Sequence, residues 1–282
     1  MRTLTALLFA LTLAGCNKAF FYPDRILLDT PDTYGINYEP VEISAEDGTH
    51  LFAWFLPARG AARGTVLYLH GNAQNISAHL PNIAWMPGAG FNVLALDYRG
   101  YGRSGGTPSI AGAQQDIDAA MRALLARPDV DPGTLFIFGQ SLGGALAIHY
   151  VAHSALRAHV RAVIVDSPFS DYRLISQEKL AAIPITWPLQ WLPALTVDND
   201  YSPQAAVHAV SPIPLLLIHG ERDGLVPLHH SQRLFERAGE PKDLWVVPDA
   251  GHIQSLKQAS VRSRLTDFLQ RHSAERLAAA PR

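Results

Sequence analysis

The chain has 282 residues, a formal net charge of −2, 48% hydrophobic residues and 17% charged residues. A chain of this length can bury a large core, and the composition excludes disorder for its main body. Because the net charge is close to zero, it gives no electrostatic argument for binding nucleic acid or an anionic membrane surface. The single cysteine, Cys16, excludes an intramolecular disulfide and a zinc site made of several thiolates.

The first fifteen residues have the features of an export signal. Arg2 precedes an apolar run over residues 4–13, which is short for a membrane-spanning helix but has the length of a signal-peptide core. The run ends in Leu13-Ala14-Gly15-Cys16, which resembles the lipobox of bacterial lipoproteins. The resemblance implies cleavage after residue 15, a diacylglyceryl group on the Cys16 thiol and an acyl chain such as palmitate on its amine. A plain secretory signal or an uncleaved apolar start remains an alternative.

Several acyl chains on one residue would anchor the protein stably at a membrane of the bacterial cell envelope, facing the periplasm. Asn17 follows the cysteine, and by resemblance to enteric sorting rules it favours the outer membrane. Residues 16–38 are expected to form a lipidated tether that docks onto a domain spanning residues 39–272. The Ala-rich residues 273–282 are expected to form a flexible tail.

A β-hairpin is predicted at the start of the domain. The apolar segments 41–43 and 51–56 flank Asp47-Gly48, and an Asp-Gly pair between apolar segments is a strong hairpin signal.

The rest of the domain alternates short apolar runs with helical stretches. Continuous apolar runs are typical of central strands in a parallel sheet that is buried on both faces. The pattern therefore predicts an α/β fold with a doubly wound, mostly parallel sheet. Residues 167–211 interrupt it with prolines and tryptophans, which favours a small cap insertion. The apolar runs are 66–69, 93–96, 135–138, 163–165, 215–218 and 244–247, and the helical stretches are 110–126, 141–153, 228–238 and 253–272.

Residues 139–143, Gly-Gln-Ser-Leu-Gly, match the G-x-S-x-G nucleophile elbow, in which a serine sits on a sharp turn from strand to helix. A second match, at residues 102–106, lies in a glycine-rich loop followed by Pro108, where no helix can begin cleanly. Because Ser141 lies directly between an apolar run and a helical stretch, we expect Ser141 to be the nucleophile and Ser104 to be a loop residue.

A serine nucleophile needs a histidine base and an acid that orients it. His252 follows a predicted strand and a loop of small residues. The histidines set against it are His149 and His153 within a predicted helix, His159, His208 and His272 with no strand before them, and His229 and His230 at the start of a helix. Asp223 follows the apolar run 215–218, and residues 219–227 resemble the H-G-x-x-D-x-x-V-P acid loop of α/β hydrolases. Asp223 is therefore the expected acid. The alternatives are Glu221, Asp166 and Asp249.

Residues 70–73, His-Gly-Asn-Ala, resemble the oxyanion segment of the same superfamily. In that resemblance the backbone N–H groups of Asn72 and Leu142 stabilise the developing oxyanion, and His70 holds the loop. Residues 97–104 resemble a structural loop of the family. These motifs, in this order, resemble the α/β-hydrolase superfamily, and most of all its single-domain serine esterases and thioesterases with small caps.

The resemblance implies hydrolysis of a small-molecule carboxylic ester or thioester through an acyl-Ser141 intermediate, with no metal or organic cofactor and no nucleic-acid partner. Peptide hydrolysis and acyl transfer would use the same residues, and a lipoprotein that only binds a ligand is a further alternative.

Overall fold

The computed structural model describes residues 20–279, so the predicted signal peptide, Cys16 and Asn17 lie outside the described residues. Its main feature is an eight-stranded sheet in the order β10-β9-β8-β7-β4-β6-β3-β2. All neighbouring strands are parallel except β3, which runs antiparallel to both β6 and β2. The predicted doubly wound, mostly parallel sheet is confirmed. Its strands are β2 (Glu39–Ser44), β3 (His50–Leu56), β4 (Gly64–Leu69), β6 (Phe91–Asp97), β7 (Leu135–Gln140), β8 (Val160–Asp166), β9 (Leu215–Gly220) and β10 (Lys242–Val247).

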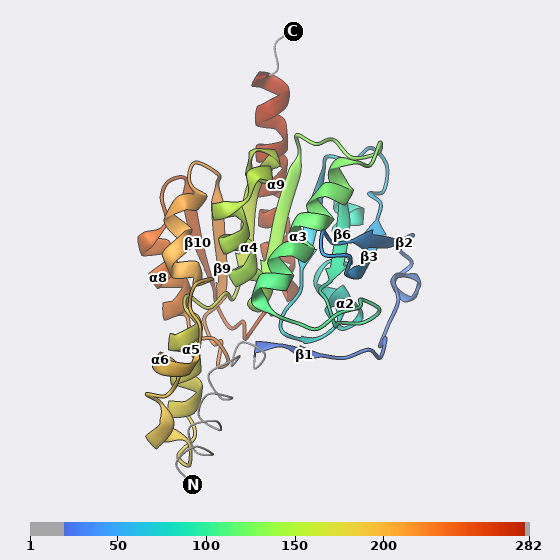
Figure 1. Cartoon of the computed structure of the whole chain (residues 1–282). Helices are drawn as coiled ribbons and strands as arrows, with labels where there is room; N and C mark the ends of the chain where they lie inside the picture. Colours follow the sequence, from blue (N-terminus) through green and yellow to red (C-terminus); the bar gives the residue numbers. More distant parts are fainter. Residues whose placement is uncertain (1–19, 280–282) are drawn as a thin grey trace.

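Helices cover both faces of this sheet (Figure 1). In the figure α3, α4 and α8 lie in front of the strands and α9 lies behind them. Side chains of the central strands are therefore buried on both sides, which explains why their sequences are continuously apolar. Within the described residues, no helix is both long and apolar enough to span a bilayer. The covering helices are α2 (Ile76–His79), α3 (Ile110–Leu125), α4 (Leu142–His153), α8 (His229–Arg237) and α9 (Ala259–Ala279).

The predicted hairpin is formed by β2 and β3, which pair antiparallel from Glu39–Phe55 to Ser44–His50. Gly48 in the turn has φ 80°, a value that side-chain-bearing residues rarely adopt. The Asp47 carboxylate accepts the N–H of Thr49 at 3.0 Å and stabilises the turn.

The interval 167–211, predicted to form a cap, contains helices and turns and no strand in the described structure. The cap helices α5 and α6 lie beyond the ends of the strands, at the lower end of the molecule in Figure 1. The short helices of the cap are α5 (Tyr172–Ala181), α6 (Pro193–Thr196) and α7 (Pro203–Ala206). Single 3-10 turns occur at Pro31–Tyr34, Leu80–Asn82, Pro87–Ala89, Ala155–His159, Trp187–Leu189, Val207–Val210 and Ser255–Lys257.

Both ends of the described chain contain regular secondary structure. Near the N-terminal end, β1 (Tyr22–Pro23) pairs in parallel with β5 (Ala73–Gln74), which begins at the last residue of the predicted oxyanion segment. At the other end, α9 extends to Ala279, whereas the domain was predicted to end at residue 272. The helix continues because Ser273 is buried and its hydroxyl donates to the Leu269 carbonyl at 3.0 Å.

A buried ion pair holds the loop after β6. Arg99 donates to Asp116 of α3 at 2.8 Å and also to Asp47 of the hairpin at 2.8 Å. The Asp116 side chain is fully buried, and its charge depends on Arg99 for compensation.

We predict that Arg99→Met lowers the free energy of unfolding by about 3–5 kcal/mol, because it leaves the buried Asp116 carboxylate without its positively charged partner and with only the backbone N–H of residue 99. Urea denaturation measures the change. Arg122→Met is the matched control, since Arg122 pairs with Asp118 on the surface and its loss should hardly move the midpoint. Equal shifts in the two variants would contradict this account.

Candidate active site

Ser141 occupies a strained turn between β7 and α4. Its backbone has φ 51° and ψ −115°, an unusual conformation for a residue with a side chain. The turn requires the glycines of the motif: a Cβ on Gly139 would lie 2.3 Å from the Gly143 carbonyl oxygen, and a Cβ on Gly143 would lie 2.1 Å from the Leu69 carbonyl oxygen. Glycine at these two positions lets α4 begin in direct contact with the backbone of the strands, and this close contact makes the turn at Ser141 sharp.

His252 and Asp223, predicted from separate segments, lie together at the carboxyl edge of the sheet. His252 Nδ1 is 2.8 Å from Asp223 Oδ2. Asp223 follows β9 and His252 follows β10, and these strands are parallel neighbours. The bond fixes the orientation of the imidazole, which is what a general base requires.

The loop that carries Asp223 is fixed by hydrogen bonds. The N–H groups of Leu225 and Val226 donate to Asp223 Oδ1 at 2.9 and 2.8 Å. His219 Nε2 donates to the Val226 carbonyl at 2.8 Å. Burial raises the pKa of Asp223, but the bonds from His252, Val226 and Leu225 outweigh it and hold this pKa below its usual value. The carboxylate is therefore ionised at neutral pH.

The loop that carries His252 reaches across the sheet edge to the serine turn. Ser255 Oγ donates to Asp166 Oδ1 at 3.0 Å, and the N–H of Ile253 donates to Ser167 Oγ at 3.3 Å. The N–H of Ser141 in turn donates to the Asp166 carbonyl at 2.9 Å. The three predicted residues thus meet at one edge. Within the described residues the hydroxyl of Ser141 makes no hydrogen bond, and catalytic bonds of this kind often tighten only when substrate binds.

A cavity of about 520 Å³ opens beside the serine. Ser141, Asn72 and Leu142 contribute to its wall. Leu142 is the first residue of α4, so its N–H has no partner within the helix. The Asn72 segment is held by its carbonyl, which accepts from Tyr101 Oη at 2.6 Å and from the Tyr22 N–H at 2.8 Å. Both residues predicted to supply oxyanion donors therefore border the same cavity as the serine.

A buried polar network beneath the elbow was not foreseen from the sequence. Gln140 Oε1 accepts from Tyr68 at 2.5 Å and from Asn82 at 2.8 Å, so its amide nitrogen donates to Asp166 at 3.0 Å. Burial raises the pKa of Asp166 to about 6, although the bonds from Gln140 and Ser255 lower it. Gln140 is the variable position of the serine motif, and nothing in the motif reveals what its side chain contacts.

Ser104, the serine of the second G-x-S-x-G match, is held by backbone hydrogen bonds. Ser104 is fully buried; its hydroxyl donates to the Asp97 carbonyl at 2.7 Å and accepts the N–H of Phe52 at 2.8 Å. His70 is also buried, with Nδ1 2.7 Å from the Gly71 carbonyl oxygen. The alternative acid Asp249 forms an exposed ion pair with Arg222.

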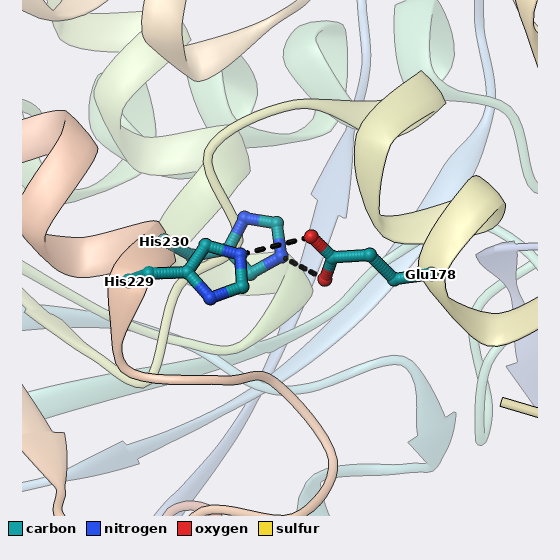
Figure 2. Close-up of side chains that lie close together, drawn as sticks. All are labelled: Glu178, His229 and His230. Atoms are coloured by element: carbon teal, nitrogen blue, oxygen red, sulfur yellow. Dashed lines mark hydrogen bonds and ion pairs between the residues drawn. The ribbon is translucent and has the colours of Figure 1, made fainter. Parts of the chain in front are cut away.

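A second cluster of ionisable groups joins the cap to the domain. Figure 2 shows the imidazoles of His229 and His230 of α8 side by side, each facing one carboxylate oxygen of Glu178 of α5, with Nε2–oxygen distances of 2.9 and 3.0 Å. Two histidines and a carboxylate could ligate a metal ion. However, His230 Nδ1 accepts the N–H of Ser170 at 3.1 Å, so Nε2 carries the proton and donates to Glu178. A histidine that binds metal through Nε2 instead donates from Nδ1.

This cluster is therefore a hydrogen-bonded connection between α5 and α8 rather than a metal centre. Burial lowers the pKa of His230 to about 4, which keeps the ring neutral. Lys179 Nζ adds a further bond from the cap to the carbonyl of Leu225, next to the acid. The cap is thus fastened to the loop that carries Asp223.

Comparison with known proteins identifies the family. Residues 60–211 match the family model described as "Serine aminopeptidase, S33". The protein YfhR of Escherichia coli (strain K12) is 39% identical over 257 residues, which cover 89% of this chain and 86% of that protein. The chain belongs to this family of α/β hydrolases.

Two further proteins are similar to this chain. The α/β-hydrolase domain-containing protein WAV2 of Arabidopsis thaliana is 32% identical over 221 residues, which cover 74% of this chain and 69% of that protein. Among solved structures, the esterase Pf2001 of Pyrococcus furiosus is similar to this chain, with a TM-score of 0.72 and 26% sequence identity. The match covers 90% of this chain and 98% of the Pf2001 chain.

We predict that Asp166→Asn removes a pH-dependent loss of stability from the hydrolase. The pKa of Asp166 is raised in the folded state, so its stabilising contribution is complete below pH about 4 and is lost as the pH rises through about 6. The loss should be on the order of 2 kcal/mol. Asparagine imitates the protonated acid and cannot ionise. Urea titrations of both proteins from pH 4 to 7 measure the difference, and a difference that stays constant over this range would contradict the assignment.

Proposed function

We propose that the protein is a serine hydrolase that cleaves a carboxylic ester or thioester, with Ser141 as nucleophile, His252 as base and Asp223 as acid. The observation that carries the proposal is the 2.8 Å contact between His252 Nδ1 and Asp223 Oδ2 at the edge where Ser141 sits on its strained turn. An imidazole oriented by a carboxylate, at the sheet edge that carries a serine on a strand-to-helix turn, is the arrangement that activates an alcohol.

In this proposal, His252 Nε2 accepts the proton of Ser141 as the oxygen attacks the substrate carbonyl carbon. The carbonyl oxygen becomes an oxyanion and accepts hydrogen bonds from the N–H groups of Asn72 and Leu142. His252 then gives the proton to the departing alcohol or thiol, which leaves acyl-Ser141. Water, deprotonated by His252, attacks the acyl group; the acid is released and Ser141 recovers its proton. Asp223, ionised throughout, stabilises the imidazolium that forms in each half-reaction.

The cavity supports an acyl substrate. Its wall is mostly aliphatic and aromatic, with Phe169, Ile175, Leu180, Leu192 and Val226 among the residues that form it. An acyl chain placed there removes apolar surface from water, which favours binding. The esterase Pf2001, similar to this chain over nearly its whole length, supports the same substrate class.

An aminopeptidase activity, which the name of the family model suggests, has less support. Binding a free α-ammonium group in a desolvated pocket requires an acidic partner. Among the described residues that form the cavity wall, the only charged side chain is Lys179, which would repel an ammonium group. Acyl transfer uses the same steps with an alcohol or amine in place of water, and assays with an added acceptor distinguish it from hydrolysis.

We also propose that the protein is exported and anchored in the cell envelope through acyl chains on Cys16. The support is the lipobox-like tetrapeptide Leu13-Ala14-Gly15-Cys16, which contains the only cysteine of the chain.

The nucleophile is tested with two serine variants. A fluorophosphonate should label wild-type protein at Ser141, because an activated serine attacks phosphorus readily. Ser141→Ala should abolish the label and lower kcat roughly 10⁴-fold, since only binding and oxyanion stabilisation remain. Ser104→Ala is the matched control: it removes two buried hydrogen bonds, which lowers the melting temperature, but it should leave the label and kcat nearly unchanged. Comparable loss of kcat in two folded variants would refute the choice of Ser141.

Lipidation is tested by growing the bacterial host with radioactive palmitate. Wild-type protein should carry the label, and Cys16→Ala should carry none, because the chain has no other cysteine thiol. Asn17→Asp keeps the cysteine and is the matched control; it should still be labelled and should shift towards the inner membrane. Labelling of Cys16→Ala, or no labelling of the wild type, would overturn the anchor.

A further inference from the structure

The tip of the cap is an exposed apolar surface. Six large hydrophobic side chains there are more than two-fifths exposed, with Ile185 at 86% and Leu195 at 66%. No charged residue occurs between Lys179 and Asp198. Contiguous apolar surface on a folded protein marks a site of contact with another apolar body. We define this cap surface as Ile183, Ile185, Trp187, Leu189, Trp191 and Leu195.

The same segment forms one wall of the substrate cavity. Leu192, Pro193 and Val197 line the cavity, whereas Trp191 and Leu195, next to them in the chain, face outward. The cap surface and the cavity are therefore two sides of one thin layer of chain.

The N-terminal end of the described chain lies beside the cap and the cavity. The Phe20 ring packs against Tyr172 of α5, with centroids 4.9 Å apart, and Phe20 and Tyr22 both line the cavity. In Figure 1, β1 lies at the same end of the molecule as α5 and α6, and the described end of α9 lies at the opposite end. Four residue steps separate Cys16 from Phe20, and such a segment spans at most about 15 Å.

We infer that the cap surface is immersed in the interfacial region of a lipid bilayer and that acyl chains of membrane lipids enter the cavity from it. The inference rests on the proposed ester hydrolysis for its substrate, a membrane lipid ester, but the orientation is independent of the chemistry. If acylated Cys16 or the apolar run 4–13 lies in a bilayer, the short link to Phe20 holds the cap against that bilayer. Two tryptophans in an uncharged segment are typical of side chains at the bilayer interface.

The orientation is tested with the full-length chain in phosphatidylcholine vesicles whose acyl chains carry bromine, which quenches tryptophan on contact. Of the five tryptophans, Trp187 and Trp191 lie on the cap surface, Trp54 and Trp245 are buried in the core, and Trp85 is partly buried against the core. We expect bromine to lower the emission of the two cap tryptophans at least about twofold. The difference in emission between the wild type and Trp187→Phe/Trp191→Phe measures how much of the total emission comes from the two cap tryptophans. The double variant is the control, and bromine should quench its remaining emission little.

Emission that does not respond to bromine would overturn the inference, and iodide in the aqueous phase then identifies what covers the cap. Quenching by iodide would mean that the cap faces water. Protection from both quenchers would mean that protein covers the cap, either the N-terminal segment of this chain or another chain.

Activity assays separate the orientation from the proposed chemistry. Ile185→Glu/Leu195→Glu should lower hydrolysis of a long-chain ester embedded in vesicles at least about tenfold, because glutamate does not enter the interface readily. Hydrolysis of a soluble short-chain ester should stay unchanged, since both side chains point away from the cavity. Val246→Glu, at a 41% exposed position of β10, is the matched control and should alter neither activity. Equal loss on both esters would overturn the route from the bilayer, whereas wild-type protein inactive on every ester but quenched by bromine would refute the hydrolysis alone.

Discussion

The close contact between helix α4 and the backbone of the strands is the constraint on which the candidate site depends. Gly143 lies so near the Leu69 carbonyl that no side chain fits there. This contact forces the turn at Ser141 into its strained conformation and fixes the first amide of α4. Because β4 and β7 are parallel neighbours, with Leu69 opposite Gly139, the segment after β4 ends beside the same turn. One packing contact therefore positions both the serine and the proposed oxyanion donors.

Two buried carboxyl groups share this sheet edge, and their partners make them different acids. Asp223 accepts two backbone N–H bonds and a bond from His252, all of which favour the ionised form. Asp166 accepts bonds from the neutral side chains of Gln140 and Ser255, which do not offset its burial. A carboxylate that stabilises an imidazolium must stay charged, so the environment favours Asp223 as the acid of the triad. Asp166 instead joins the elbow to the loop that carries His252.

The cap lies between the proposed triad and the exposed apolar surface from which we infer that the substrate enters. Glu178 and Lys179 bind α5 to α8 and to the acid loop, so the cap is fastened next to the proposed triad. The outward side chains beyond this connection are apolar, and the cavity behind them is apolar as well. A water-soluble substrate would gain little from such a surface, whereas a lipid would meet apolar contacts along its whole path.

The sequence by itself determined the fold class, the hairpin and the segments that bear Ser141, Asp223 and His252. These features depend on local patterns: continuous apolar runs for buried parallel strands, Asp47-Gly48 for the turn, and polar residues directly after strand ends. The pairing of those segments, the network around Gln140 and the connection of α5 to α8 were decided only by the tertiary structure. They join side chains that are dozens of residues apart, and their geometry depends on strand order and helix packing. No local pattern encodes these, because the same side chain is solvated or buried according to what the fold places beside it.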